Sequence, residues 1–153
     1  MARIEDIYQP TRDQVAGLAI AEPTTSPWVA PKPLFRSTIA LVTSAALHPR
    51  STPPFAAGSA EFRKLPASTP ASDLVMSHIS INYDRGGFQR DINTVYPVDR
   101  MGELVAEGIV GALAPNGYSV MGSTDPATMS ATADAMAADM REAKVEAALF
   151  LPV

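Results

Sequence analysis

The sequence predicts an α/β fold in which helices flank a mostly parallel sheet, in a three-layer Rossmann-like or flavodoxin-like arrangement. Short apolar runs bounded by turn residues alternate with segments whose apolar residues recur at helical spacing. Of the 153 residues, 46% are hydrophobic, which is enough for one core without covalent staples. No internal repeat is present. We therefore expect a single α/β domain over residues 1–153, in which residues 1–37 form a proline-rich N-terminal arm.

The first third of the chain supplies the arm and one strand. Residues 1–22 mix charged and apolar residues and predict a short amphipathic helix that Pro10 interrupts. Residues 23–37 hold four prolines, which favour extended backbone. Residues 38–47, TIALVTSAAL, predict a buried strand. His48 follows this strand, where ligands bind in open α/β sheets.

The middle of the chain is irregular and polar. Residues 49–72 are rich in proline, serine and threonine and predict a long loop, within which residues 61–65 form a short strand. Residues 73–81, DLVMSHISI, predict a second strand by their alternating pattern. A polar loop over residues 82–93 follows, and Asp99 then caps and begins a helix.

The last third returns to alternating strands and helices. Residues 118–121 predict a short strand, and Asp125 with Pro126 predicts the start of another helix. Three methionines and an alanine recur at helical spacing in that helix and predict a core stripe: Met129, Ala133, Met136 and Met140. Residues 145–151, VEAALFL, predict a final buried strand.

Charge and composition exclude several classes of function. The formal charge is −4 and no run of Lys or Arg occurs, so we expect no nucleic-acid or anionic-membrane partner. The chain has no cysteine, which excludes disulfides, thiolate metal sites and a cysteine nucleophile within it. The N-terminus lacks a secretory signal and no apolar run reaches membrane-spanning length, so we expect a cytoplasmic protein.

Polar and ionisable residues are concentrated over residues 78–100, around the flexible pair Gly86-Gly87. Apolar runs flank this stretch on both sides. It therefore predicts either a binding rim held on a buried scaffold or a solvated loop with ordinary ion pairs.

Five segments of the sequence resemble segments of one protein family, and they occur in the same order along the chain. They are TSPWVAPKPL (25–34), SHISINYDR (77–85), DINTVYPVDR (91–100), ELVAEGIVGALAP (103–115) and YSVMGSTDP (118–126). The chain resembles the selenoprotein B family, the substrate-specific components of the glycine, sarcosine, betaine and D-proline reductases, together with short relatives of unassigned substrate.

The resemblance implies a chemistry and a missing residue. In the family, the closing strand leads into a selenocysteine or cysteine, and AALFLPV (147–153) matches that strand. We hypothesise that the chain is truncated there at a UGA codon for selenocysteine read as stop. The family reaction is reductive C–N bond cleavage, in which a selenolate displaces the amine. A thiol-based partner then regenerates the selenolate. We therefore expect no cofactor besides selenocysteine, and a chain that is inactive without its nucleophile.

The resemblance also suggests roles for residues. His78 would protonate the leaving amine, Arg85 or Arg90 would pair with a substrate carboxylate, and Asp84 or Asp91 would hold an ammonium group. The predicted substrate-binding set is Asn82, Asp84, Arg85, Arg90, Asp91, Asn93 and His48. The expected partners are an amino-acid-like or amine substrate and a thiol or selenol reductase protein, and an exposed sheet edge favours a homo-oligomer.

Simpler interpretations compete with each role. A histidine within a strand is often only a hydrogen-bonded structural residue, and Asp91 and Asn93 can tie the loop to its own backbone. His48 and His78 lack a clear third ligand, so we predict no metal site. The alternative function is a non-catalytic α/β domain that binds a small ligand or another subunit.

Overall fold

The computed structural model describes residues 4–17, 26, 28–30, 32–80 and 85–153. The chain divides into two compact units, Met1–Ala30 and Pro31–Val153. The smaller unit contains a 3-10 turn, η1 (Ile4–Asp6), and helix α1 (Gln9–Ala16). The predicted interruption at Pro10 is wrong, because this proline lies in the first turn of α1, where a missing N–H costs no helical hydrogen bond.

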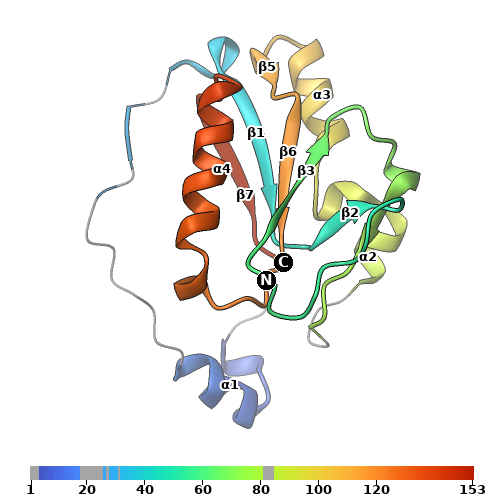
Figure 1. Ribbon diagram of the computed structural model, residues 1–153, viewed down its shortest axis with the longest axis vertical. Coiled ribbons are helices and arrows are strands. Elements are labelled where there is room, and N and C mark those ends of the chain that lie inside the picture. The colour runs from blue at the N-terminus through green and yellow to red at the C-terminus, as the bar shows by residue number, and fades with distance from the viewer. Residues whose placement is uncertain (1–3, 18–25, 27, 31, 81–84) are drawn as a thin grey trace. The chain divides into compact units, whose positions relative to one another are not determined.

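The larger unit is built on a five-stranded sheet (Figure 1). Its strands are β1 (Thr38–Thr43), β3 (Phe62–Pro66), β5 (Ala112–Leu113), β6 (Asn116–Val120) and β7 (Ala147–Leu151). β1 is central: β5 and then β6 pair with it in parallel on one side, and β7 pairs with it in parallel on the other. β3 pairs antiparallel with β6. The sheet is therefore mostly parallel, as predicted.

A separate ribbon of two antiparallel strands consists of β2 (Leu47–Pro49) and β4 (Leu74–Met76), which follows η3 (Ala71–Asp73). The sequence predicted one strand over residues 38–47, but the structure ends β1 at Thr43. Ala46 has a φ of 52°, a left-handed conformation that a continuous strand does not accommodate. The chain turns there from the main sheet into the ribbon.

Helices cover both faces of the main sheet (Figure 1). Alternate residues of β1 point to opposite faces, so Leu41 joins a core cluster with Met101 of α3 (Val98–Ala106), whereas Val42 joins one with Met136 of α4 (Ser130–Glu142). The predicted fold class, a mostly parallel sheet with flanking helices, is confirmed.

The polar stretch is more ordered than predicted. The described part of the expected loop over residues 82–93 contains helix α2 (Gly86–Arg90) and the start of η4 (Ile92–Thr94). Ile92 is buried and anchors the stretch in the core. The remaining short helical turns are η2 (Leu34–Arg36) and η5 (Pro126–Thr128). Asp125 accepts a hydrogen bond from the Ala127 N–H, so it caps η5 rather than α4.

Two apolar segments are more exposed than the sequence predicted. β7 was predicted to be buried, yet Leu149 is 42% and Phe150 68% exposed, because β7 is an edge strand. In the methionine stripe, only Met136 is fully buried. All four members line an open groove, and Met140 is half-buried against the core cluster that contains Met136.

Candidate functional site

The carboxyl ends of three parallel strands, β1, β6 and β7, meet at one edge of the main sheet. In open α/β sheets this edge is where ligands bind. Ser44 directly follows β1, Gly122 lies two residues beyond β6, and Val153 lies two residues beyond β7. These positions form what we term the carboxyl-edge cluster.

Ser44 connects the three strand ends. Its N–H donates to the Leu151 carbonyl at 3.1 Å, and its own carbonyl accepts from the Gly122 N–H at 2.9 Å. The Ser44 hydroxyl accepts from the Val153 N–H at 2.8 Å and lies 3.4 Å from the Val153 carbonyl oxygen. A single small side chain thus holds the backbone that leaves β7.

Gly122 leaves room for a histidine beside this serine. A Cβ atom built on Gly122 would lie 2.8 Å from the Ser44 carbonyl oxygen, 2.9 Å from Ser44 Cβ and 3.0 Å from His78 Nε2. His78 Nε2 and Ser44 therefore both lie next to the space that a side chain at position 122 would occupy. The structure places the predicted acid, His78, at the carboxyl edge.

The orientation of His78 is set by its flanking backbone. The Ser77 N–H donates to the Ala46 carbonyl at 3.0 Å, and the Ser80 N–H donates to His78 Nδ1 at 3.2 Å. Since Nδ1 accepts a hydrogen bond, the proton of the neutral ring is on Nε2, which is the nitrogen next to Gly122. The carbonyls of His78 and Ser80 both accept from the Arg85 guanidinium.

His78 is also electrostatically poised. Only 5% of its surface is exposed, and this burial lowers the pKa of the imidazole below its ordinary 6.5, with the nearby Arg85 charge lowering the pKa further. The ring is therefore mostly neutral at pH 7. It presents Nε2–H as a hydrogen-bond donor at the carboxyl edge.

The predicted arginines lie at the two ends of α2, and Arg85 also donates to the His78 carbonyl. Arg85 precedes α2 and lines a hollow of about 280 Å³ that also includes Arg50 and Gln89. Arg90, at the end of α2, lines a second hollow of about 280 Å³ that shares Arg50 and Gln89 and includes Asp91. The two hollows form a surface that could bind a carboxylate through its guanidinium groups.

Asp91 and Asn93 build a local cap. Asp91 Oδ1 accepts from the Asn93 backbone N–H at 2.9 Å and from Asn93 Nδ2 at 2.7 Å, which lowers the pKa of the Asp91 carboxyl. Asn93 Oδ1 accepts from the backbone N–H groups of Asp99 at 3.1 Å and Arg100 at 3.4 Å, in the first turn of α3. Asn93 therefore caps α3, the role that the sequence assigned to Asp99.

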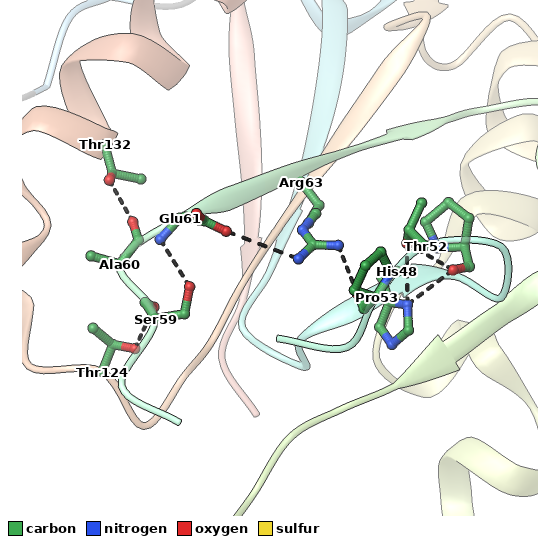
Figure 2. A network of polar contacts seen from close by, with 10 residues as sticks. His48, Thr52, Pro53, Ser59, Ala60, Glu61, Arg63, Thr124 and Thr132 are labelled. Carbon is green, nitrogen blue, oxygen red and sulfur yellow. Dashed lines mark hydrogen bonds and ion pairs between the residues drawn. The ribbon is translucent and has the colours of Figure 1, made fainter. Parts of the chain in front are cut away.

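His48 belongs to a different polar network, which Figure 2 shows together with Thr52 and Arg63. Its Nδ1 donates to the Pro49 carbonyl at 2.9 Å and lies 3.3 Å from the Thr52 hydroxyl. His48 is 4% exposed, and within the described residues its buried Nε2 has no hydrogen-bond partner. The described residues contain no group of three His, Cys, Asp or Glu side chains that could hold a metal. Two further predicted site residues, Asn82 and Asp84, lie outside the described residues.

An apolar groove of about 630 Å³ opens beside the carboxyl-edge cluster. One wall is the methionine stripe of α4, the other is Phe150 with the end of β7, and Ser44 and Gly122 line the floor. Among the residues that the structure describes, no charged side chain lines it. The groove can therefore accept an apolar group next to the polar atoms of Ser44.

Sequence reasoning missed Ser44, Gly122 and the groove. Ser44 was placed inside a longer predicted strand, and Gly122 was given no role beyond its place in the matching segment YSVMGSTDP. The positive φ of Ala46, which ends β1 early and brings Ser44 to the edge, leaves no signal in an alanine-rich run. Gly122 carried a usable signal, because a glycine shortly after a buried parallel strand often marks a close approach of backbone or ligand.

Comparison with known proteins places this site in a family context. The family described as glycine/sarcosine/betaine reductase selenoprotein B matches residues 21–152. The chain belongs to this family. A curated relative, D-proline reductase subunit gamma of Acetoanaerobium sticklandii, is 39% identical over 92 residues, which are 60% of this chain and 37% of the relative. No solved structure matches the chain.

No helix in the described residues is long and apolar enough to span a membrane.

Proposed function

We propose that this selenoprotein B chain binds an amine or amino-acid substrate at its carboxyl edge, for reductive cleavage of the substrate C–N bond. The observation that supports this most directly is the placement of His78 Nε2 beside Ser44 and Gly122, where three parallel strands end. The family match supplies the reaction class. The proposal concerns only the part of the reaction that these residues can perform.

His78 is the proton donor in this proposal. Reductive cleavage of a C–N bond needs two electrons and two protons, and the departing nitrogen takes up one of these protons as it leaves. A histidine whose pKa lies below 6.5 is a stronger acid in its protonated form, but that form is already the minor one at pH 7. Arg85 positions the ring by holding the carbonyl groups of His78 and Ser80.

The groove next to Ser44 takes the apolar part of the substrate. Arg85 holds two backbone carbonyls and Arg90 lines a separate hollow on α2, so we assign neither arginine to the carboxylate of a substrate bound beside Ser44. The remaining predicted members of the set are Asn82, Asp84, Asp91, Asn93 and His48. Of these, Asp91 and Asn93 act indirectly, by fixing the start of α3 beside α2.

The reducing group comes from outside these residues. None of the 153 residues is a cysteine, so the selenol or thiol of the family chemistry is not among them. When present, that group would supply the electrons as a nucleophile at the carboxyl edge. We propose that a thiol or selenol reductase protein is the partner, in a cytoplasmic setting, and that this chain alone binds substrate without reducing it.

The absence of cysteine also favours a second candidate, a non-catalytic domain that binds a small ligand or another subunit. Isothermal titration calorimetry with D-proline, glycine, sarcosine and betaine separates the two. The proposed function predicts that at least one of them binds and that His78→Gln weakens binding. Absence of binding by all four would favour the second candidate. Release of amine by the 153-residue chain with dithiothreitol alone would contradict the need for an outside nucleophile.

A further inference from the structure

Three arginines from separate segments line two hollows beside α2, which lies against the ribbon of β2 and β4 (Figure 1). Each hollow has a volume of about 280 Å³, and Arg50 lines both of them. Arg85 lines the first hollow and Arg90 lines the second. Because Arg50 directly follows β2, the ribbon brings it to α2 from a distant part of the sequence. The fold thus gathers three guanidinium groups on one surface of a chain whose formal charge is −4.

Backbone carbonyls hold two of these guanidinium groups in place. Arg50 Nη2 donates to the Ser72 carbonyl at 3.1 Å. Arg85 Nη2 donates to the carbonyls of His78 and Ser80. An arginine side chain has five N–H donors, so these bonds use only the Nη2 end of each fork. Side chains that are already held lose less conformational freedom when a ligand binds to them.

The carboxylates around the two hollows do not neutralise the arginines. None of the ion pairs within the part of the chain that the structure describes includes Arg50, Arg85 or Arg90. Among the described residues, Asp91 is the one acidic residue that lines either hollow, and its Oδ1 accepts two hydrogen bonds from Asn93. Three arginines and one aspartate leave a net charge of +2, which matches a doubly charged anion better than a singly charged one.

The walls of the two hollows favour a small ligand. Leu74 and Phe88 line both hollows and belong to the same core cluster, which fixes α2 against the ribbon. Gln89 also lines both and carries a neutral amide donor. A third hollow, which Arg50 shares with Asp73, has one charge of each sign and does not favour an anion. At about 280 Å³, each of the first two hollows is at the lower limit of small-molecule sites and suits a single anionic group.

We propose that the hollows lined by Arg50, Arg85 and Arg90 bind a doubly charged oxyanion, either free phosphate or the phosphate group of a monoester. Guanidinium groups match paired phosphate oxygens through two parallel hydrogen bonds. Arg50 makes the central contact, because it lines both hollows. Arg85 belongs both to this site and to the support of His78, so the anion lies one side chain away from the carboxyl-edge cluster.

The shared arginine couples the anion site to His78. Burial is the main cause of the lowered pKa of the imidazole, and the positive charge of Arg85 lowers this pKa further. An anion in contact with Arg85 offsets that charge and should raise the pKa of His78. This inference does not rest on the proposed function, because anion binding is measured without substrate or a reducing partner. Anion binding without amine binding would retain this site and reject the proposed function.

Isothermal titration calorimetry of the 153-residue chain with sulfate, inorganic phosphate and glycerol phosphate tests the site. All three should bind saturably, at one ion per chain, and acetate should bind more weakly because it carries a single charge. Tighter binding of glycerol phosphate than of inorganic phosphate would support a monoester as the ligand, and the reverse order would support free phosphate. Equal affinity for acetate would contradict a site for a doubly charged anion.

Arginine variants locate the binding, after circular dichroism has established that each is folded. Arg50→Gln and Arg90→Gln should each raise the sulfate dissociation constant at least about tenfold. Arg141→Gln is the matched control. It removes the same charge from an exposed position in the last turn of α4 and should change the dissociation constant by less than about twofold.

NMR titration of His78 in saturating sulfate tests the contact with Arg85. Sulfate stays doubly charged throughout the titration of a histidine, so only the imidazole changes its charge. The pKa of His78 should rise in sulfate but not in sodium chloride of equal ionic strength, and Arg50→Gln should lose the rise. Absence of saturable anion binding, unchanged affinity in both arginine variants, an equal loss in Arg141→Gln, or an unchanged His78 pKa with sulfate bound would overturn the proposal.

Discussion

Gly122→Ala is the substitution that most directly perturbs the carboxyl-edge cluster. The added methyl group would lie 2.8 Å from the Ser44 carbonyl oxygen, 2.9 Å from Ser44 Cβ and 3.0 Å from His78 Nε2. The first contact is with backbone that also accepts the Gly122 N–H, so it cannot be relieved by a side-chain rotation. Overpacking of this kind costs about 1–3 kcal/mol, and we expect the upper half of that range. Backbone strain does not contribute, since φ at Gly122 is not left-handed.

Urea unfolding followed by circular dichroism measures the cost. Gly102→Ala is the control: Gly102 lies within α3 with nothing within 4 Å of its Cβ position, so alanine should stabilise the chain by about 0.5–1 kcal/mol. NMR titration of Gly122→Ala should also show the His78 pKa shifted toward 6.5, because the displaced ring is less buried. A Gly122→Ala chain as stable as the unaltered one, with an unchanged His78 titration, would refute the geometry of the cluster.

Four other outcomes are expected. Asn93→Ala removes the cap of α3 and should cost about 1–2 kcal/mol in urea unfolding, with faster hydrogen exchange in the first turn of α3 but not in β1. The pKa of His78 is lower in the folded chain than in the unfolded chain, so the unfolded state binds more protons as the pH falls through 6.5. The free energy of unfolding should therefore decline from pH 7.5 to 5. His78→Gln should remove the part of this decline that His78 causes. In the same pH range, Arg85→Gln should raise the His78 pKa by removing a nearby positive charge, and an unchanged or lower pKa would contradict the assignment. Tyr118→Phe removes a 2.7 Å hydrogen bond to Asp139 and should cost about 1–2 kcal/mol, whereas a neutral effect would show that this half-buried hydrogen bond contributes little.

Regular hydrophobic patterns predicted the framework of the fold correctly. β1 was evident from a short apolar run between turn residues, and helices α3 and α4 from apolar spacing and from cap residues near their starts. Composition alone could not locate breaks within such runs. The turn at Ala46, which separates β1 from β2, depends on a left-handed alanine that no local preference predicts.

Long-range pairing decided the remaining elements. The composition of β7 is that of a buried strand, and only its position at the sheet edge leaves Phe150 exposed. The predicted loop after residue 81 contains α2 despite its two glycines, because Phe88 and Ile92 pack on the core and offset the low helix propensity of Gly86-Gly87. Tertiary packing overrides local preference in both segments.

Only part of the candidate site was predictable from the sequence. His78 was singled out because it is ionisable near neutrality, and the structure places it at the carboxyl edge. Asn93 was assigned to substrate on the basis of residue type, but its polar atoms bind Asp91, Asp99 and the start of α3. Residue type suggests what a side chain can bind, whereas its partner is set by residues distant in the sequence.

The most direct test of the carboxyl-edge site is an NMR titration of the two histidines with D-proline, glycine, sarcosine and betaine. The chain contains only His48 and His78, so their imidazole signals are readily assigned with one substitution. A ligand bound beside Ser44 should shift the His78 Nε2 signal saturably and leave His48, which belongs to another network, unchanged. Unchanged His78 signals with all four compounds, or equal shifts at both histidines, would contradict a substrate site at the carboxyl edge.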